Sequence, residues 1–480
     1  MKTNLNVDTQ ALREKILDLA MRGKLVKQDA GDEPASVLLK RIKAEKAELV
    51  KEGKIKKSKK LPAITDDEKP FDIPDSWEWV RLNTIFSVND RNTAEDDTVT
   101  AFVPMSHIED GYGDRFTFIS KQWREIKSGY THISDGEIII AKITPCFQNR
   151  KSCIVRGLPN KIGAATTEVY ALSEVSTIIK EYFLYFFKSQ YFIKNGVNNF
   201  SGAVGQQRVP RKYLESILLP LPPLAEQKRI ANKVSELFTQ VDIIEKNVAE
   251  YQDLEQAMRS KLLDLAMRGK LVEQDPSDEP ASELLKKIQS EKAQLVKEGK
   301  IKKSKKLPEI TDDEKPFDIP DSWEWVRLGD IFDLKSGKNI KASLISEIQN
   351  EENPYPCFGG NGVRGFVSDK NRSGHYAIIG RQGALCGNIN VANGQFYATE
   401  HAVVVEHFGL TVVEWGVIFL KALNLNQYAT STAQPGLAVS KINLVLIPLP
   451  PLAEQRQIAD KVSKLFEQLD IINNNLVSAS

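Results

Sequence analysis

The chain has 480 residues, which is enough for two to four domains that each bury a hydrophobic core. A hydrophobic content of 41% and a charged content of 27% are ordinary for a globular protein, and the net charge of +1 lacks the basic excess expected of a protein that binds nucleic acid unaided. Without a long apolar run or a signal-peptide pattern at the N-terminus, we expect a cytoplasmic protein with no membrane partner.

The N-terminal part is predicted to contain the end of one helix and then a second helix. An apolar stripe with helical spacing comes first, at Leu12, Ile16 and Leu19. The stretch "EPASVLLKRIKAEKAELVKEGK" then begins at a proline, ends at a glycine and has one apolar face. The lysine-rich "KIKKSKK" that follows could neutralise phosphates, or it could be a solvated loop.

Residues 87–216 are predicted to form a mixed α/β or α+β domain. The run "GEIIIAKI" is typical of a strand, whereas "STIIKEYFLYFFKSQYFIKNG" is typical of helix. The loops "TPCFQNRKS" and "SGAVGQQRVP" carry side chains that can hydrogen-bond to base edges, beside glycines that allow a close backbone approach. Composition alone leaves open that they are ordinary loops.

A long coiled-coil helix is predicted from about residue 225 to residue 268. Apolar residues recur there at spacings of four and three, first at Ile230, Val234, Leu237, Val241 and Ile244. At about 1.5 Å per residue, this helix would be roughly 64 Å long. The C-terminal segment repeats the stripe at Ile458, Val462, Leu465, Leu469 and Ile472. The alternative is that these helices are core elements of ordinary domains.

Residues 333–444 are predicted to form a second mixed domain. It contains the stretches "YPCFGGNGVRGFVSDKN", "YAIIGRQGALCGNINVANGQFYATEHAVVVE" and "VEWGVIFLKALNL", and like the first variable segment it has the look of a compact α/β or α+β domain. The glycine-rich loops "GGNGVRG" and "GRQGALCGN" could read bases, although the Asn-Gly pair would equally suit a hairpin turn. The two variable segments do not resemble each other at a glance.

Two copies of one framework organise the chain. Residues 14–86 match residues 260–332 with 60 of 73 positions identical, and residues 217–244 match residues 445–472 with 20 of 28 identical. The central copy of the long helix is unbroken, whereas the other copy is split between the two ends of the chain. We therefore predict a pseudo-two-fold, cyclically permuted repeat with two long antiparallel helices, in which the C-terminal fragment needs the N-terminal fragment to complete its copy.

The sequence contains no catalytic or metal-binding motif. The phosphate-binding GxxxxGK[ST] loop is absent, and "NPYP" has the wrong order for the Asn-Pro-Pro-aromatic motif of adenine methyltransferases. The Glu-x-Lys sequences at 52–54 and 298–300 lack the preceding hydrophobic strand of a nuclease site. The four cysteines include no CxxC pair and the five histidines are scattered, so we expect no metal site, no disulfide framework and no catalytic residue.

Several motifs occur in an order that spans nearly the whole chain. They are the paired "LPLPPLAEQKRIANKV" and "IPLPPLAEQRQIADKV", the doubled "DLAMRGKLV" and "IPDSWEWVRL", "IIIAKITPCFQNRKS" with "GAATTEVY", "SGAVGQQRVP", and "IIGRQGALCGN" with "ATEHAVV". In this arrangement the chain resembles the specificity subunits of type I restriction–modification systems, in particular those with long repeated arms.

The resemblance implies an α/β (α+β) fold with two target recognition domains separated by two long antiparallel coiled-coil helices. The implied division is a helical arm at 1–69 that completes the second coiled-coil helix, target recognition domain 1 at 70–222, a central region at 223–315, target recognition domain 2 at 316–450, and a C-terminal helix at 451–480. The ten apolar residues named above in the long central helix and in the C-terminal segment would form the coiled-coil and partner interface.

The resemblance also places DNA contacts in both recognition domains, by position. In the first domain they are Lys142, Thr144, Gln148, Asn149, Lys151, Gln206, Gln207 and Arg208. In the second domain they are Asn361, Arg364, Arg381, Gln382 and Ser431.

The implied function is sequence-specific DNA recognition without catalysis. Each domain would read one half of an interrupted double-stranded site and direct adenine-N6 methylation or ATP-dependent cleavage by two methylation and two restriction subunits. S-adenosylmethionine, ATP and Mg²⁺ would be cofactors of those partners, with none bound by this chain. Two alternatives are a DNA-binding protein that works alone and a coiled-coil scaffold whose end domains bind proteins.

Overall fold

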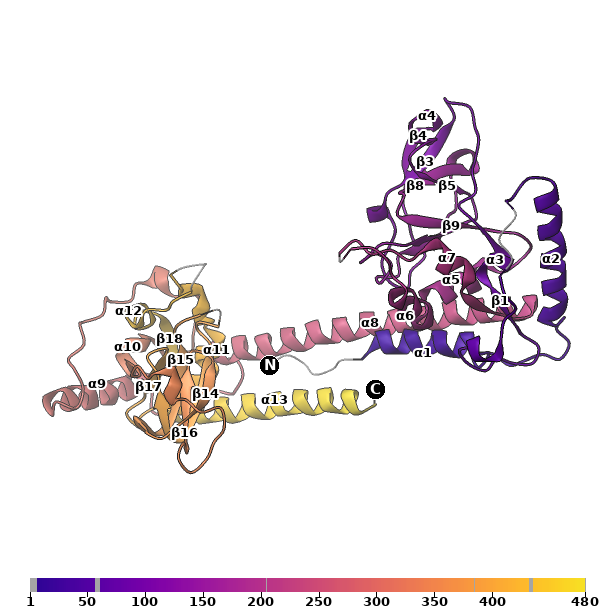
Figure 1. Ribbon diagram of the computed structural model, residues 1–480. Helices are drawn as coiled ribbons and strands as arrows, with labels where there is room; N and C mark the ends of the chain where they lie inside the picture. The colour runs from indigo at the N-terminus through magenta and orange to yellow at the C-terminus, as the bar shows by residue number, and fades with distance from the viewer. Residues whose placement is uncertain (1–6, 57–60, 204, 384, 431–434, 480) are drawn as a thin grey trace. The chain divides into compact units, whose positions relative to one another are not determined.

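The computed structural model describes residues 7–56, 61–203, 205–383, 385–430 and 435–479. These residues form two compact units, one built from residues 7–248 and the other from residues 249–479. We call them the first and the second unit and describe each by itself (Figure 1). One helix, α8 (Leu224–Met267), contributes its first part to the first unit and its last part to the second.

Two antiparallel helices form the base of the first unit. Near the start of α1 (Thr9–Met21), Arg13 donates to Asp242, whereas Gln28, beyond the end of α1, donates to Glu226 near the start of α8. The order of these contacts shows that α1 and α8 run in opposite directions. The predicted antiparallel arrangement is therefore confirmed for this pair.

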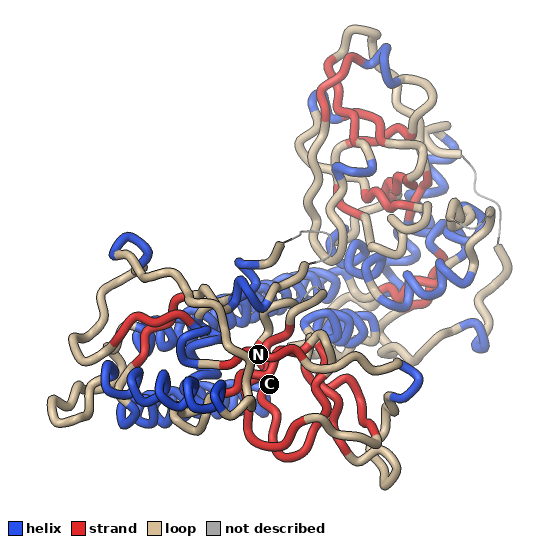
Figure 2. The backbone as a smooth tube through the Cα atoms, turned by 90° about the vertical axis from the view of Figure 1, so that its left-hand side faces the viewer, coloured by secondary structure: helices blue, strands red, loops and turns tan. Residues whose placement is uncertain are grey.

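The strands of the first unit form two four-stranded sheets and a two-stranded ribbon (Figure 2). One sheet is antiparallel, in the order β2 (Phe86–Val88), β9 (Val169–Glu174), β6 (Ile138–Ala141) and β7 (Ser152–Ile154). The other has the order β4 (Ile119–Gln122), β3 (Val99–Val103), β8 (Ile162–Ala165) and β5 (Thr131–Ser134). The ribbon pairs β1 (Glu78–Arg81) with β10 (Leu218–Leu221), which brings the two ends of the variable segment together.

Helices complete the core of the first unit. The aromatic stretch predicted to be helical forms two helices, α5 (Lys180–Lys188) and α6 (Gln190–Asn198), because Ser189 caps the second one by accepting from the backbone N–H of Phe192. Phe183, Phe186, Phe187 and Phe192 are buried between these helices and the sheet. The arm helix α2 (Ala35–Lys51) packs on the same core.

The second unit repeats the framework. It contains the arm helix α9 (Ala281–Lys297), the ribbon of β11 (Glu324–Arg327) with β18 (Leu446–Leu449), and α13 (Leu452–Ala479) antiparallel to the last part of α8. Its sheet has the order β12 (Asp333–Ser336), β17 (Ala402–Glu406), β15 (Arg372–Gly380), β16 (Ile389–Ala398), β13 (Tyr355–Gly359) and β14 (Gly362–Val367). Helix α11 (Val413–Ala422) packs against this sheet.

The two variable segments share a four-stranded core that the sequence comparison missed. The antiparallel order β2-β9-β6-β7 of the first unit corresponds to β12-β17-β15-β16 of the second. The first unit adds a separate sheet, whereas the second adds a hairpin, β13–β14, that extends the same sheet. Buried strands need only apolar residues of suitable size, so a common sheet leaves little sequence identity.

The structure explains why "PPLAEQ" occurs twice. In the first unit, buried Glu226 accepts from the indole N–H of Trp77 at 2.9 Å, and Gln227 accepts from the backbone N–H of Ile179 at 3.0 Å while donating to the carbonyl of Pro222. The motif therefore joins the start of the long helix to the arm and to the variable segment. In the second unit, Glu454 and Gln455 make the same contacts with Trp323, Val412 and Pro450.

The predicted apolar stripe is only partly a buried seam. Ile230, Val234, Val241, Ile458, Val462 and Leu469 are buried, and Leu237 and Leu465 are partly buried. Ile244 and Ile472, however, are 38% and 48% exposed, so their place in the coiled-coil and partner interface stays a prediction. In the first unit the cause is the length of α1, which begins at Thr9, opposite Glu245.

The predicted mixed fold, with internal repeat and long helices, is confirmed. The five domain boundaries and the joining of the C-terminal helix to the N-terminal one stay predictions. Within the ranges that the structure describes, no helix is long and apolar enough to cross a membrane.

Candidate nucleic-acid interface

In the first unit, two loops with predicted DNA contacts lie side by side. The loop that follows β6 (residues 142–151) pairs with residues 205–209. The backbone N–H of Val209 donates to the carbonyl of Lys142 at 2.9 Å, and that of Thr144 donates to the carbonyl of Gln207 at 3.0 Å. These backbone bonds bring Lys142, Thr144, Gln206, Gln207 and Arg208 together, as a joint reading surface requires. We call these two loops the paired loops of the first unit.

The second unit has paired loops at the equivalent positions. After β15, Leu437 donates to the carbonyl of Arg381 at 2.8 Å, and Gly383 donates to the carbonyl of Pro435 at 3.0 Å. Arg381 and Gln382 therefore take the places that Lys142 and Ile143 have in the first unit. The same backbone arrangement thus presents different side chains in the two units. Ser431 lies outside the described residues.

The charged side chains of the first paired loops are held by neighbours at the start of β9. The ammonium of Lys142 lies 5.0 Å from the centre of the Tyr170 ring, and burial lowers the pKa of Lys142. Arg208 makes two hydrogen bonds to Glu168, at 2.8 and 2.9 Å, which lower the pKa of this carboxyl group. The sequence search missed Glu168 and Tyr170, although both lie in the "GAATTEVY" motif.

The outer part of the loop after β6 departs from the prediction at one position. Gln148 and Asn149 are exposed, as DNA contacts must be. The side chain of Lys151 is only 13% exposed, and its ammonium donates to the carbonyl of Ile108 and pairs with Asp110 at 3.2 Å. This placement argues against Lys151 as a DNA contact, because its charge is already used inside the domain.

A buried lysine that the sequence search missed holds this loop in place. The ammonium of Lys188 donates to the carbonyls of Gly111 at 2.9 Å, Arg150 at 3.2 Å and Ser152 at 3.0 Å. Burial lowers the pKa of Lys188 to about 8. The one signal in the sequence was a lysine inside an aromatic run, "YFFKSQYF".

In the second unit, three predicted contacts line one pocket of about 590 Å³. Asn361, Arg364 and Gln382 lie around it with His401, and Gly359, Gly360 and Gly383 supply backbone. His401 takes the position that Glu168 has in the first unit. The backbone carbonyl of His401 accepts from the backbone N–H of Arg381, as the backbone carbonyl of Glu168 accepts from the backbone N–H of Lys142. Arg381 itself turns away from the pocket and donates to Ser336 at 3.0 Å.

Such a site suits hydrogen bonding to base edges better than bond-breaking chemistry. Amide and guanidinium groups match the donor and acceptor patterns of adenine and guanine in the major groove. Within the described residues, no group of three or more His, Cys, Asp or Glu side chains is placed to hold a metal ion.

Comparison with known proteins gives the family of the chain. The family described as "Type I restriction modification DNA specificity domain" matches residues 74–251 and 320–478, one match in each copy of the repeat. The chain belongs to this family. Among curated relatives of this specificity family, the type I restriction enzyme EcoAI specificity subunit of Escherichia coli is 38% identical over 95% of this chain and 88% of its own length.

Two solved structures are similar to this chain in fold. A chain from a study of complex assembly and conformational transition of the type I R-M system superposes with a TM-score of 0.57 at 21% identity, covering 85% of this chain and 95% of that chain. The HsdS subunit from Thermoanaerobacter tengcongensis superposes with a TM-score of 0.52 at 19% identity, covering 85% and 96%. At these identities the likeness concerns the fold alone.

Proposed function

We propose that this chain is the DNA-recognition subunit of a type I restriction–modification system and that each unit reads one half of an interrupted double-stranded site. The observation that carries the proposal is the equivalence of the paired loops. One backbone arrangement carries Lys142, Ile143 and Thr144 in the first unit but Arg381, Gln382 and Gly383 in the second. A reader of two different half-sites needs this combination of a common frame and unlike side chains.

The subunit itself carries out no bond-breaking step. Two methylation subunits would transfer a methyl group from S-adenosylmethionine to adenine N6, and two restriction subunits would use ATP and Mg²⁺ for cleavage. The absence of a phosphate-binding loop and of an Asn-Pro-Pro-aromatic motif in the sequence supports this division of tasks. The net charge of +1 is compatible with DNA binding because partner subunits around the DNA would supply part of the positive field.

The decisive experiment is methylation mapping by single-molecule sequencing of a host genome. The chain is co-expressed with the methylation subunit of its own system, and the map is compared with that of the methylation subunit alone. We expect N6-methyladenine in one interrupted motif only when the chain is present.

The alternatives give other results. A DNA-binding protein that works alone would bind one sequence tightly without any partner and cause no methylation. A coiled-coil scaffold would bind no DNA with or without partners.

A further inference from the structure

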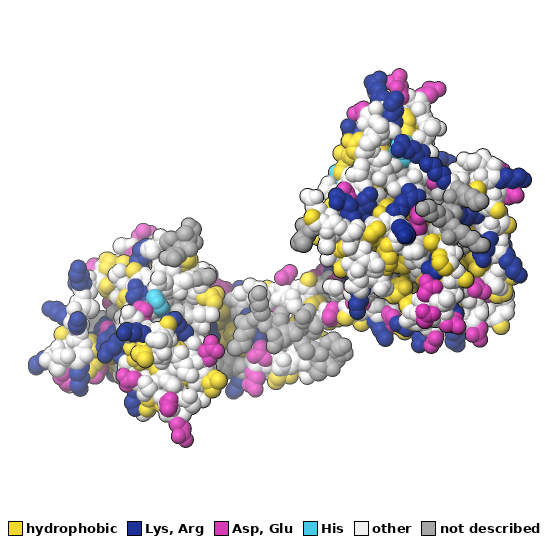
Figure 3. Space-filling view, viewed as in Figure 1, with side chains coloured by type: hydrophobic (Ala, Val, Ile, Leu, Met, Phe, Trp, Pro, Cys, Tyr) yellow, Lys and Arg dark blue, Asp and Glu magenta, His cyan; other side chains and the backbone are white. Residues whose placement is uncertain are grey.

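A lysine-rich segment of the second unit has no part in the paired loops. Residues 299–308 contain no acidic residue and five lysines, at positions 300, 302, 303, 305 and 306. Because the whole chain has a net charge of only +1, this segment is a marked local concentration of positive charge. Figure 3 shows Lys and Arg side chains gathered over the part of the second unit where α9 lies in Figure 1.

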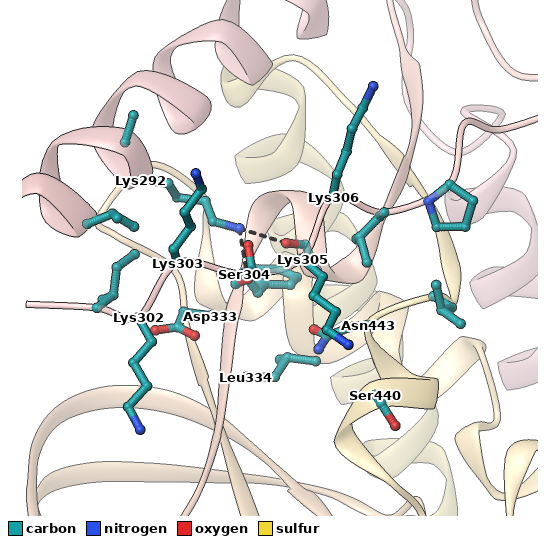
Figure 4. Close-up of a pocket in the computed structure, with 18 of the residues that line it drawn as sticks. Lys292, Lys302, Lys303, Ser304, Lys305, Lys306, Asp333, Leu334, Ser440 and Asn443 are labelled. Carbon is teal, nitrogen blue, oxygen red and sulfur yellow. Dashed lines mark hydrogen bonds between the residues drawn. The ribbon is translucent and has the colours of Figure 1, made fainter.

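The segment forms one wall of a pocket of about 780 Å³. Figure 4 shows the side chains of Lys302, Lys303, Lys305 and Lys306 along this wall, with Asp333 and Asn443 on the facing elements. The four lysines are exposed. Asp333 does not leave an uncompensated negative charge in the pocket, because Lys335 pairs with it at 2.8 Å. None of the residues that line the pocket of Asn361 lines this one.

Lys292 also lines the pocket, but its ammonium group is bonded to backbone carbonyls and does not serve as a binding group. Its ammonium donates to the carbonyls of Gly329 at 2.7 Å and Asp330 at 3.3 Å, at the short helix α10 (Leu328–Ile331). In the first unit Lys46 makes the equivalent contact with the carbonyl of Asn83. These bonds hold the arm helix against the start of the variable segment. The lysine-rich segment follows the arm helix, so its first residues have a fixed position.

The repeat indicates what kind of ligand the four lysines take. The sequence "LVKEGKIKKSKKLP" is identical at 49–62 and 295–308, whereas the paired loops differ between the units. Because the two lysine-rich segments are identical while the paired loops beside them differ, a ligand of these segments must be the same at both half-sites. The phosphate backbone of DNA has this property, because it is independent of the base sequence.

The character of the segment also favours DNA over a protein surface. The cores of protein–protein interfaces are depleted in lysine, whereas phosphate contacts are commonly made by lysine and arginine. In an extended segment the four lysines span at most about 14 Å, which is the rise of about four base pairs.

We propose that Lys302, Lys303, Lys305 and Lys306 bind phosphates of duplex DNA outside the bases that the second unit reads. The inference rests on the proposed DNA-recognition function and adds a contact that is independent of sequence. Because each lysine–phosphate contact releases counterions, the segment adds affinity that falls as salt rises.

The test uses the full chain assembled with the methylation subunits of its own system. The four lysines are changed together to alanine, and in a matched control variant together to arginine. Binding to a fluorescent duplex with its recognition site is measured from low to moderate salt, and methylation of the same site is recorded in parallel. A second duplex, trimmed to the ends of the recognition site, is measured with each protein.

For the alanine variant we expect the slope of log affinity against log salt to be smaller by about 2 to 4, because each phosphate that a lysine no longer neutralises removes about 0.9 from the slope. The arginine variant keeps the slope, the variants methylate the same motif as the parent, and trimming the duplex weakens the parent more than the alanine variant. An unchanged slope overturns the inference, and so does a loss of methylation subunits from the alanine complex, which would identify the segment as a protein-binding surface. If the parent complex methylates no specific motif, the proposed function itself fails, which is a separate result.

Discussion

Arg13 donates to Asp242 across the two antiparallel helices of the first unit, with 2.5 Å between the nitrogen and the oxygen. Arg259 and Asp470 repeat this contact in the second unit at 2.6 Å. The surroundings differ, because Arg13 has a second acid on the opposite helix, Glu245, whereas the second acid beside Arg259 lies one turn earlier on its own helix. Each unit therefore holds its helix pair with a largely buried arginine and two carboxylates.

Arg13→Met is expected to lower the free energy of unfolding by about 1–2 kcal/mol. The side chain of Arg13 is only 10% exposed, but Asp242 and Glu245 are 69% and 45% exposed and stay hydrated when the arginine is removed, which limits the cost. Chemical denaturation of the chain measures the change. Lys233→Met is the control, because it removes an exposed pair with Glu236 on α8 and should cost under about 0.5 kcal/mol. Equal losses would show that burial of the arginine contributes nothing.

Two isoleucines of the same stripe are expected to respond differently to truncation. Ile230 is fully buried and Ile244 is 38% exposed, although both have the spacing of seam residues. Ile230→Ala should therefore cost about 2–5 kcal/mol and Ile244→Ala less than about 1 kcal/mol in the chain alone. The comparison of denaturation midpoints is direct because the substitution is the same. A large loss at Ile244 would mean that it has a partner in solution.

The stripe also shows how far the sequence predicts the structure. Its periodicity correctly gave a long helix and the face that carries apolar residues, but not how much of that face a neighbour covers, which depends on where α1 begins. The repeat predicted the framework because the residues that make its contacts, such as Trp77 and Glu226, have counterparts in both copies. The common sheet was missed because buried strands tolerate many apolar residues.

For the candidate site, the two predicted loops of the first unit were the ones that the structure pairs, whereas in the second unit the predicted loop after β15 pairs with residues 435–437. Single side chains were less predictable. Lys151 turns inward because the carbonyl of Ile108 and the carboxylate of Asp110 lie beside it, and both come from a distant part of the sequence. Lys188 and His401 were missed because their roles depend on which backbone groups the fold brings next to them. Residue type and loop position predict only where a reading surface forms.

Glu137 is expected to make the first unit less stable as pH rises. Burial raises the pKa of Glu137 from 4.5 to about 7, so the folded chain holds a proton between these values that the unfolded chain has released. The contribution is fully present below about pH 4.5 and is lost as pH rises through 7. The expected loss is on the order of 3 kcal/mol.

Glu137→Gln should remove this pH dependence while keeping the fold. A neutral amide can accept from the backbone N–H of Ser134 with its oxygen and donate to the hydroxyl of Ser173 with its nitrogen, in place of the present bonds. Denaturant midpoints of both proteins at several pH values between 4.5 and 7.5 provide the measurement. A variant that keeps the full slope of the parent would assign the pH dependence to another group.

Substitutions in the first paired loops and in the pocket of the second unit are expected to change one half-site each. Arg364→Ala or Gln382→Ala should relax the second unit's half of the methylated motif at one position, with a loss of about 5- to 150-fold in discrimination for one bidentate contact. Gln206→Ala, in the exposed part of the first paired loops, should affect only the other half. Methylation maps of the three variants, each assembled with the parent's methylation subunits, decide the matter. Because the units present their loops from separate sheets, a variant in one unit that altered both halves of the motif would contradict independent reading and assign those side chains to the stability of the whole chain.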